Sequence, residues 1–511
     1  MEDMLIRGDK VITVDKDRNI FNHGAVVVSG NKIKEVGFYT DLKAKYPDAK
    51  EIGGEDIWVI PGFVNAHYHC QALFQVRNGL LEGPLETWLL RAYSSKIGSK
   101  TPELSYWEAA YACITLLKAG ITSTIDMYYG GDDPHYLNSL DGLKGYIDAG
   151  IRVNFAPVAR DEKTSYVYAW DDDFIRSLPE KLQKELKSRP YGKQPIDSKI
   201  YIEGWENLYR DFNGHDGRIR LMLAPDGAQW VTSGFLMTIK KMAEKYRTNI
   251  QTHCLETKYQ LFYGQNHFGK SLVEYFYHLR FLGEEVSFGH GVWLTTKDIE
   301  LCAATGTSIS HNPGANLRLY SGIAPLRDYL AGGINMGIGT DNLSFDNENG
   351  FLNDLRLAFL LHRAPGIPPV SVSSEKLFEM ATIGGAKLLG LDDKVGSLSP
   401  GKEADIVLVD TKRLLSPFMH PSISPYEVLL HRGISQDINT VMVRGNILLE
   451  GGKVKTLDEK EVLAQYRNYG EKAWTDEDGD PTILDELDKY ATVFYQKEAF
   501  DISTNYQFNT K

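Results

Sequence analysis

The middle of the chain alternates between short apolar runs and longer amphipathic segments. The amphipathic segments, such as Trp107–Gly120 and Ser233–Tyr246, place apolar residues at helical spacing. The short runs predict eight strands: VIPGFVNAHYH, ITSTIDM, IRVNFAP, IRLMLAP, NIQTHC, VSFGH, SISHNP and NMGIGTD. Eight strands alternating with helices are typical of a (β/α)8 barrel of the TIM type, an α/β fold. An open doubly wound sheet is the alternative, but the chain has no G-x-G-x-x-G turn and no Walker sequence.

Short runs with β-type alternation occur near both ends of the chain. DKVITVD and GAVVVSG lie in the first 59 residues, and GKEADIVLVD and INTVMVRGNILLEGGKV lie between residues 396 and 454. We predict that residues 1–59 and 396–454 build one small β-sandwich domain, with the barrel (60–395) inserted between them. Residues 455–511 are acidic and helical in pattern, which predicts a C-terminal helical extension.

Residues 160–218 do not fit the alternation. They are polar, rich in Lys and Tyr, and longer than a strand-to-helix connection normally requires. We therefore predict an insertion, or lid, over the mouth of the barrel.

Composition narrows the class of protein. The 511 residues include 56 Lys and Arg against 68 Asp and Glu, a formal charge of −12, which argues against nucleic acid or an anionic membrane as partner. The four cysteines form no C-x-x-C pair and predict free thiols in a reducing compartment. The charged N-terminus resembles no signal peptide, and no apolar run approaches the ~20 residues needed to span a bilayer. We expect a cytoplasmic protein.

Polar residues collect where the predicted strands end. In chain order they are His67 and His69, Asp126, Asp226, His253, His290, His311 and Asp341. The carboxyl ends of barrel strands surround one mouth, where barrel active sites are built. A single histidine there is more often structural. With 13 histidines in 511 residues, however, several at strand ends are not a chance result.

His67 and His69 are two residues apart on a strand, so both side chains project from the same face. Two imidazoles so placed can bind one metal ion such as zinc or iron. His253 and Asp341 would complete a three-histidine, one-aspartate site with an open position for water. The bound metal would lower the pKa of that water towards ~7.

Three further residues are candidates for proton transfer or substrate contact. Glu256 follows His253 in THCLE and could shuttle protons beside the metal; a solvated loop carboxylate is the alternative. His290 could deprotonate the water and polarise the substrate. His311, in SHNPGAN, could face the substrate or support the site from behind.

The motifs PGFVNAHYH, THCLE, FGHGVWL, SHNPGANLRLYSGIAPL and GIGTDNLSFDN together resemble the amidohydrolase superfamily. They are most similar to its branch of cytosine, guanine and S-adenosylhomocysteine deaminases and triazine hydrolases. The resemblance continues through ATIGGAKLLGL and GSLSPGKEADIVLVD to about Val454.

The resemblance implies a (β/α)8 barrel with a β-sandwich made from both chain ends. It also implies one divalent metal per subunit, Zn2+ or else Fe2+, at the positions matching His67, His69, His253 and Asp341. Glu256 and His290 match catalytic positions. No carboxylated lysine is expected, and IRLMLAPDG offers none. A homo-oligomer, dimer or tetramer, is implied as well.

Residues and resemblance together predict a metal-dependent aminohydrolase that deaminates a small nitrogen heterocycle, such as a pyrimidine, purine, pterin or triazine. An activated water would attack a ring carbon, Glu256 would protonate the neighbouring ring nitrogen, and ammonia would leave. The alternative is hydrolysis of a C–Cl, substituted-amine or cyclic amide bond by the same machinery. Glu256 favours the amine, which needs a proton more than chloride does. A non-catalytic scaffold would require lost metal positions, and all four are present.

We expect five residues to contact the substrate: Trp88, Asp226, Trp293, His311 and Asn342. Asp226 stands in APDG where several family deaminases have a histidine, and would prefer a donor-rich or cationic substrate; a buried structural role is the alternative. Trp88, Trp230, Trp293 and Phe345 could line a flat pocket for a heterocycle, or pack in the core. The stretch Trp88–Gly98 lacks the acid of adenosine-type members, which argues against adenosine or S-adenosylhomocysteine.

Overall fold

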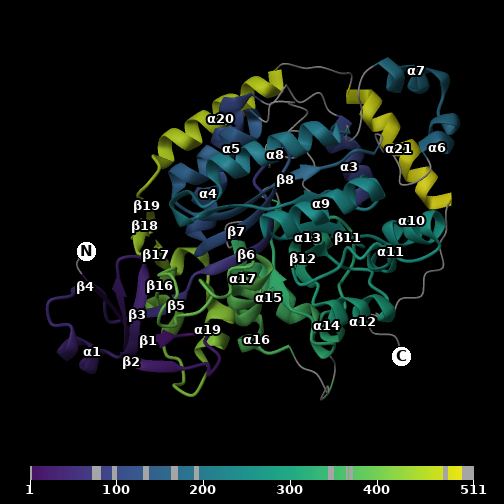
Figure 1. The fold of residues 1–511 in the computed structure, drawn as a ribbon. Helices are drawn as coiled ribbons and strands as arrows, with labels where there is room; N and C mark the ends of the chain where they lie inside the picture. Colours follow the sequence, from purple (N-terminus) through teal and green to yellow (C-terminus); the bar gives the residue numbers. More distant parts are fainter. Residues whose placement is uncertain are drawn as a thin grey trace.

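The computed structural model defines a barrel, a sheet domain and a group of helices at one side of the barrel (Figure 1). It describes residues 3–71, 82–94, 101–130, 137–162, 171–188, 195–342, 350–363, 366, 372–475 and 481–497.

The barrel wall is a ten-stranded parallel sheet. Its strands are β6 (Phe63–His69), β7 (Ile121–Tyr128), β8 (Arg152–Ala159), β9 (Ile219–Leu221), β10 (Ala224–Pro225), β11 (Ile250–Cys254), β12 (Val286–His290), β13 (Ser308–His311), β14 (Met336–Ile338) and β15 (Asp341–Asn342). β9 and β10 both pair with β8, and β14 and β15 both pair with β6. The two short strands β9 and β10 therefore occupy one strand position of the barrel, and β14 and β15 occupy another. Parallel bridges from Leu223 to Ile250 and from Gly227 to His253 close the wall. The predicted (β/α)8 barrel, with eight strand positions, is confirmed.

Helices between the strands cover the outside of the barrel. They are α4 (Pro102–Lys118), α5 (Leu137–Ala149), α8 (Ser198–Phe212), α9 (Ser233–Tyr246), α10 (Lys258–Phe268), α11 (Leu272–His278), α12 (Thr296–Thr305), α13 (Pro313–Arg318), α14 (Leu326–Ala331), α15 (Gly350–Leu361), α16 (Ser374–Glu379) and α17 (Gly385–Leu388). Thr232 is the N-cap of α9, because its hydroxyl accepts a hydrogen bond from the backbone N–H of Phe235.

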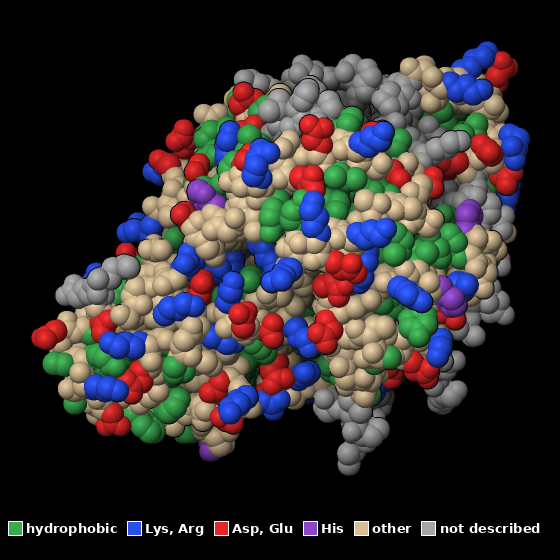
Figure 2. Space-filling model, viewed as in Figure 1, with side chains coloured by type: hydrophobic (Ala, Val, Ile, Leu, Met, Phe, Trp, Pro, Cys, Tyr) green, Lys and Arg blue, Asp and Glu red, His purple; other side chains and the backbone are tan. Residues whose placement is uncertain are grey.

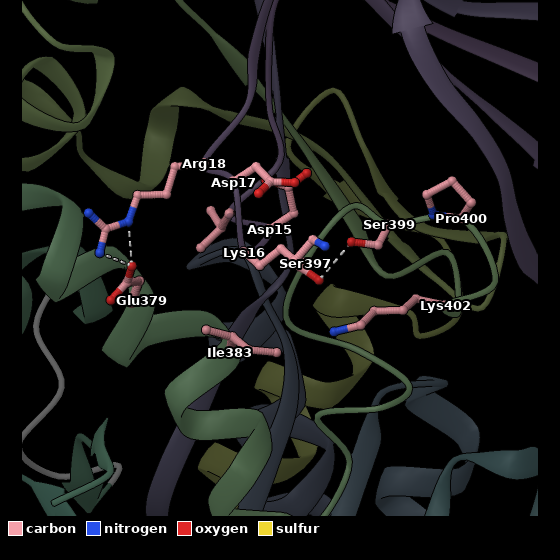
Figure 3. A pocket seen from close by; sticks show the side chains of 11 residues that line it. Asp15, Lys16, Asp17, Arg18, Glu379, Ile383, Ser397, Ser399, Pro400 and Lys402 are labelled. Atoms are coloured by element: carbon pink, nitrogen blue, oxygen red, sulfur yellow. Dashed lines mark hydrogen bonds and ion pairs between the residues drawn. The ribbon is translucent and has the colours of Figure 1, made fainter. Parts of the chain in front are cut away.

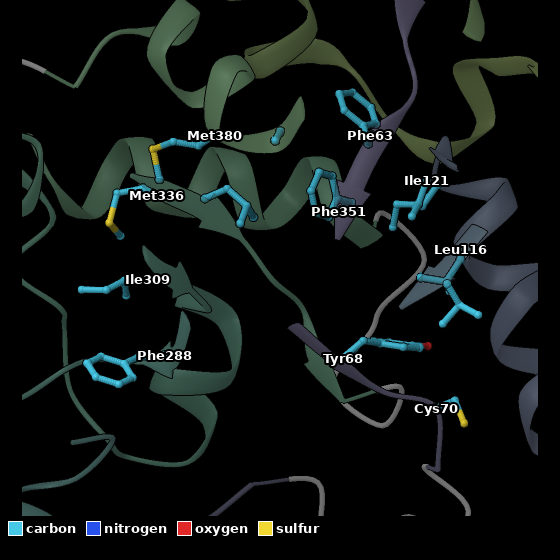
Figure 4. Close-up of a cluster of buried hydrophobic side chains, with 14 of the residues drawn as sticks. Phe63, Tyr68, Cys70, Leu116, Ile121, Phe288, Ile309, Met336, Phe351 and Met380 are labelled. Atoms are coloured by element: carbon cyan, nitrogen blue, oxygen red, sulfur yellow. The ribbon is translucent and has the colours of Figure 1, made fainter. Parts of the chain in front are cut away.

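The core lies between the barrel wall and these helices. Figure 4 shows Phe288, Ile309 and Met336 on one side of this cluster and Phe63 beside Phe351 on the other. The rings of Phe63 and Phe351 lie 5.4 Å apart, in aromatic contact. This packing fixes the strands and so the side chains at their ends.

Both ends of the chain contribute to a second, nine-stranded sheet. It contains β1 (Met4–Ile12), β2 (Ile20–Ser29), β3 (Lys32–Phe38), β4 (Lys50–Gly53), β5 (Ile57–Pro61), β16 (Ile406–Asp410), β17 (Ile438–Val443), β18 (Asn446–Glu450) and β19 (Lys453–Val454). Antiparallel pairing of β5 with β16, from Ile57 against Asp410 to Pro61 against Ile406, joins the two ends. Side chains from β1, β2, β16 and β17 share one apolar cluster, the interior expected of a sandwich.

The insertion is shorter than predicted. Its described part begins with two short helices, α6 (Asp171–Ser177) and α7 (Glu180–Ser188). Helix α8, however, is an ordinary barrel helix between β8 and β9, since Tyr201, Trp205 and Leu208 are buried against the core. Those three residues recur at helical spacing, and the polar residues between them hid the apolar face.

The C-terminal extension is helical over α20 (Glu459–Thr475) and α21 (Pro481–Lys497). α20 packs on α4, where the rings of Tyr111 and Tyr466 stack 4.7 Å apart. α21 packs on α3 (Leu85–Ser94), and its Leu487 shares an apolar cluster with residues of α6 and α7. Three distant segments of the chain therefore meet beside the barrel.

Two surface properties bear on function. Among the described helices, none combines the length and apolar character needed to cross a bilayer. Figure 2 shows acidic and basic side chains interspersed over one face of the molecule, so no field of one sign dominates that face.

Candidate active site

The polar strand ends converge at one mouth of the barrel. Nε2 of His69 lies 3.3 Å from Nε2 of His253, and Oδ1 of Asp341 lies 3.4 Å from Nε2 of His69 and 3.5 Å from Nε2 of His67. All four side chains are buried. The donor atoms form two groups that share His67, one with His69 and Asp341 and one with His253 and His290, and within each group they lie within 4.8 Å of one another.

Hydrogen bonds behind the rings fix which nitrogen carries the proton. Nδ1 of His69 lies 2.6 Å from the carbonyl oxygen of Met127, and Nδ1 of His253 lies 2.7 Å from that of Asp226. A carbonyl oxygen only accepts, so both Nδ1 atoms donate and both Nε2 atoms present lone pairs. Burial also lowers the pKa of His69 well below its usual range, which keeps that ring neutral.

His67 is oriented in the same way by a side chain. Its Nδ1 lies 2.8 Å from Oε1 of Gln251, whose amide nitrogen donates to the carbonyl of Ala66 and to Ser287. The amide oxygen is therefore the acceptor, and Nε2 of His67 also presents a lone pair.

This donor set fits a divalent metal ion. Two neutral imidazoles that face each other with lone pairs across 3.3 Å repel unless a cation lies between them. Three imidazoles and one carboxylate are the nitrogen and oxygen donors that zinc and iron accept. The hydrogen bonds on the far side of each ring are the supporting contacts that metal-binding histidines need.

The backbone is strained where these side chains leave the barrel. His290 has φ 73° and Asp341 has φ 66°, both in the left-handed region that residues other than glycine rarely adopt. Such strain gathers at functional sites, where surrounding packing holds it. Glycine at position 339 allows the backbone before Asp341 to lie close to His67, because a Cβ on Gly339 would lie only 2.8 Å from Cβ of His67.

His290 and Glu256 complete the buried centre. Nδ1 of His290 lies 2.9 Å from Oδ1 of Asn316 and 3.6 Å from Oε1 of Glu256. Burial lowers the pKa of His290 to about 3, although the charge of Asp341 opposes the shift, so the ring is neutral at pH 7. Burial alone would raise the pKa of Asp341, but the imidazoles of His67, His290 and His69 around it hold that pKa below its ordinary value. Asp341 is thus a carboxylate beside a neutral imidazole.

The five predicted substrate contacts take different positions. Asp226 is fully buried and accepts a hydrogen bond from the Tyr129 hydroxyl, with Oδ1 3.4 Å from Nδ1 of His253. His311 ends β13, and its Nε2 lies 3.1 Å from Nε2 of His362. Asn342 follows Asp341 in β15 and is buried.

The three tryptophans that were candidates for the substrate pocket have different surroundings. Trp88 packs in an apolar cluster with Leu85, Ala315 and Leu319, and Trp293 donates to the carbonyl of Ser321 at 2.7 Å. Trp230 is buried as well. Phe345 and residues 95–98 of the Trp88–Gly98 stretch lie outside the described residues.

Sequence reasoning missed the residues that hold the site from behind. Gln251 is two residues before His253 on one strand face, so its spacing was a usable signal. Asn316, which holds His290, and Gln260, which accepts from the N–H of Glu256 at 2.9 Å, carried no local signal. Glu86 was also missed: its Oε1 accepts a hydrogen bond from Oγ1 of Thr257 at 2.5 Å. The sequence did show an acidic residue two positions before the Trp88-Leu89 pair, and this could have marked Glu86 as a candidate.

Glu86 predicts a pH dependence of stability. Burial raises its pKa to about 7, and the hydrogen bond from Thr257 and the charge of Lys258 oppose only part of that shift. The folded protein therefore keeps a proton that the unfolded chain releases above pH 4.5, so this group destabilises the fold increasingly up to pH 7, by about 3 kcal/mol at most. We expect Glu86→Gln to melt higher than wild type at pH 8, with the difference shrinking towards pH 4.5. Equal melting temperatures at both pH values would contradict this.

A separate cavity of about 730 Å3 lies between the β1–β2 loop of the nine-stranded sheet, the end of α16 and residues 397–402 (Figure 3). Its lining carries Lys16, Arg18 and Lys402 against Asp15, Asp17 and Glu379, and Arg18 pairs with Glu379. None of the converging strand-end residues lines it, so it is not part of the candidate active site.

Fold and site together define a (β/α)8 hydrolase with a buried cluster of histidines and a carboxylate at the barrel mouth. The model of the Amidohydrolase family matches residues 58–448. The chain belongs to the amidohydrolase family and is a hydrolase.

The chain is similar to curated deaminases over most of its length. It is 28% identical to the 5'-deoxyadenosine deaminase of Methanosarcina mazei, over 92% of this chain and 98% of that protein. It is 28% identical to the 5-methylthioadenosine/S-adenosylhomocysteine deaminase of Pelotomaculum thermopropionicum, over 91% and 97%. A 5'-deoxyadenosine deaminase of Methanobrevibacter smithii is 30% identical, over 87% and 92%.

Solved structures share the fold. An adenosine deaminase from Xanthomonas campestris with bound zinc superposes with a TM-score of 0.79 at 22% identity, covering 93% of this chain and 99% of that one. The atrazine chlorohydrolase of Arthrobacter aurescens complexed with zinc gives 0.79 at 24% identity, covering 91% and 100%. The predicted family and fold are confirmed.

Proposed function

We propose that this chain is a metal-dependent aminohydrolase that removes an amino group from a nitrogen heterocycle as ammonia. The observation that carries the proposal is the convergence of four metal-type donors beside Glu256 and His290. A divalent metal bound by these residues would lower the pKa of a water molecule towards ~7.

His67, His69, His253 and Asp341 would hold the metal, with zinc first and iron second. Imidazole nitrogens and a carboxylate oxygen suit zinc, and Gln251, the Met127 carbonyl and the Asp226 carbonyl hold the three rings in the required tautomer. The zinc named for two structures of the same fold supports this choice.

Asp341 and His290 would take the proton of the attacking water. Asp341 is the carboxylate of the centre, and His290 is neutral with Nδ1 engaged by Asn316, so its Nε2 can accept. As the water oxygen bonds to the ring carbon, Glu256 gives a proton to the adjacent ring nitrogen. The proton taken up by Asp341 or His290 then passes to the amino group, the C–N bond breaks and ammonia leaves, while the hydroxyl proton of the tetrahedral carbon returns to Glu256 and a carbonyl group forms. The ring keeps the water oxygen, so atoms and protons balance.

An adenine-type ring is the first substrate to test. The curated relatives are named as deaminases of 5'-deoxyadenosine and of 5-methylthioadenosine and S-adenosylhomocysteine. The stretch Trp88–Gly98, however, lacks the acidic residue that adenosine-type members carry there. Pyrimidines, pterins and triazines therefore belong in the same panel.

Ammonia release from this panel by the zinc-loaded protein tests the proposal. We expect at least one aminated heterocycle to yield ammonia, and Glu256→Gln to lower kcat by ~10²–10⁴-fold, because the amide cannot deliver a proton. Glu300→Gln on the exposed face of α12 is the matched control and should leave kcat unchanged. Release of chloride or an alkylamine without ammonia would replace deamination with the alternative chemistry.

A further inference from the structure

Helix α3 meets the catalytic end of the barrel through one buried carboxyl group. Oε1 of Glu86 accepts a hydrogen bond from Oγ1 of Thr257 at 2.5 Å, across 171 residues of sequence. Glu86 is 6% exposed and Thr257 4% exposed. Since Thr257 directly follows Glu256, this bond ties the residue beside the proposed proton shuttle to a helix from another part of the chain.

The segment that carries Glu256 needs such support. It leaves β11 through Leu255, whose φ of 49° lies in the left-handed region. The carbonyl of Leu255 accepts from the N–H of Trp293 at 2.9 Å, and the N–H of Glu256 donates to Gln260. These bonds hold the backbone on the barrel side, and the Glu86–Thr257 bond holds it from α3.

Helix α3 is itself firmly held. Backbone N–H groups of Gly83 and Leu85 donate to the carbonyls of Arg318 and Leu319, at 2.9 and 3.0 Å. Trp88 packs beside Leu319 at the end of α13, the helix that carries Asn316. On the other side, Leu90 packs with residues of α21, α6 and α7. Figure 1 shows α3 beside α21. A carboxyl group on this helix therefore acts from a fixed place.

Stability does not explain this carboxyl group. Burying a carboxyl group behind one hydrogen bond disfavours its charged form, and burial accordingly raises the pKa of Glu86. A glutamine would accept the same hydrogen bond without that cost.

We propose that Glu86 is a positioning residue, which fixes Glu256 for proton transfer by holding the Thr257 hydroxyl against helix α3. The inference rests on the proposed function, since it takes Glu256 as the proton shuttle. Glu86 acts on Glu256 through Thr257 and not on the reacting atoms themselves.

A double-mutant cycle tests the inference. We expect Glu86→Ala and Thr257→Val each to lower kcat by roughly tenfold to hundredfold with KM little changed, because misplacing a catalytic group slows chemistry more than binding. The double variant should be no slower than the worse single variant. Glu86→Gln and Thr257→Ser keep the hydrogen bond and should recover most of the lost kcat. Thr87→Ala, one residue along α3, is the control for the helix.

Hydrogen–deuterium exchange gives a readout independent of activity. Glu86→Ala should speed exchange of the amides in residues 255–260, whereas Glu86→Gln and Thr87→Ala should not. Independent, multiplicative losses of kcat in the cycle, or unchanged exchange in Glu86→Ala, would overturn the positioning role. If the wild-type protein releases no ammonia, the proposed function fails alone, and the exchange measurement still decides whether Glu86 holds this segment.

Discussion

Replacing Asp341 with Asn is expected to remove most of the bound metal and to lower kcat/KM by roughly 10³–10⁴-fold, because a lost metal contributes several kcal/mol. The amide has no negative charge to balance a divalent cation among three neutral imidazoles. It also cannot take a proton from water. Asn tolerates the left-handed backbone at this position (φ 66°) as Asp does, so the fold should survive. Metal content after dialysis, measured with kcat/KM, gives the result.

Asp56→Asn supplies the matched control for that experiment. Asp56 also has a left-handed backbone, with φ 59°, and lies just before β5 in the sheet domain. The same chemical change at the same type of backbone should leave metal content and kcat/KM at wild-type values. If Asp341→Asn behaved like Asp56→Asn, Asp341 would not belong to the metal site.

The barrel and its mouth were predictable for a physical reason. Strands buried on both faces appear in the sequence as apolar runs, so a polar residue at the end of each run stands out. Parallel strands in a closed barrel place all those ends on one face, so His67, His253 and Asp341 could be grouped without knowing any contact between them. The structure places ligand atoms of His67 within 4.8 Å of those of His253 and His290, and also within 4.8 Å of those of His69 and Asp341.

The supporting contacts could not be predicted, because they depend on tertiary packing. Glu86 and Thr257 are joined only when α3 docks on the barrel, and Asn316 reaches His290 only through the turn of α13. No periodicity along the chain marks such pairs. Helix α8 was hidden for another reason, since its buried aromatic residues are separated by charged ones that raised the polarity of the whole stretch.

One buried arginine, Arg152, forms ion pairs between the barrel and the nine-stranded sheet domain. Arg152 on β8 is 2% exposed and donates to both oxygens of Asp405 at 3.1 Å, to Glu403 at 2.6 Å and to the carbonyl of Gly217 at 2.8 Å. Asp405 and Glu403 precede β16 of the sheet domain. The two carboxylates are buried too. Glu403 also pairs with Arg444 at 3.1 Å, whereas the ion pair that the described residues offer to Asp405 is the one with Arg152.

Arg152→Met is therefore expected to destabilise the folded protein by about 3–5 kcal/mol, since it leaves the buried Asp405 without this counter-charge and Glu403 with Arg444 as its nearest cation. That is a large part of the ~5–15 kcal/mol that separates most folded domains from the unfolded state. Denaturant unfolding at pH 7 measures the loss. Arg210→Met, which breaks the exposed ion pair with Asp211, should leave stability nearly unchanged. Adding Asp405→Asn to Arg152→Met should recover part of the loss, because it removes one stranded charge. A double variant no more stable than Arg152→Met would show that packing around the arginine, and not its charge, joins the domains.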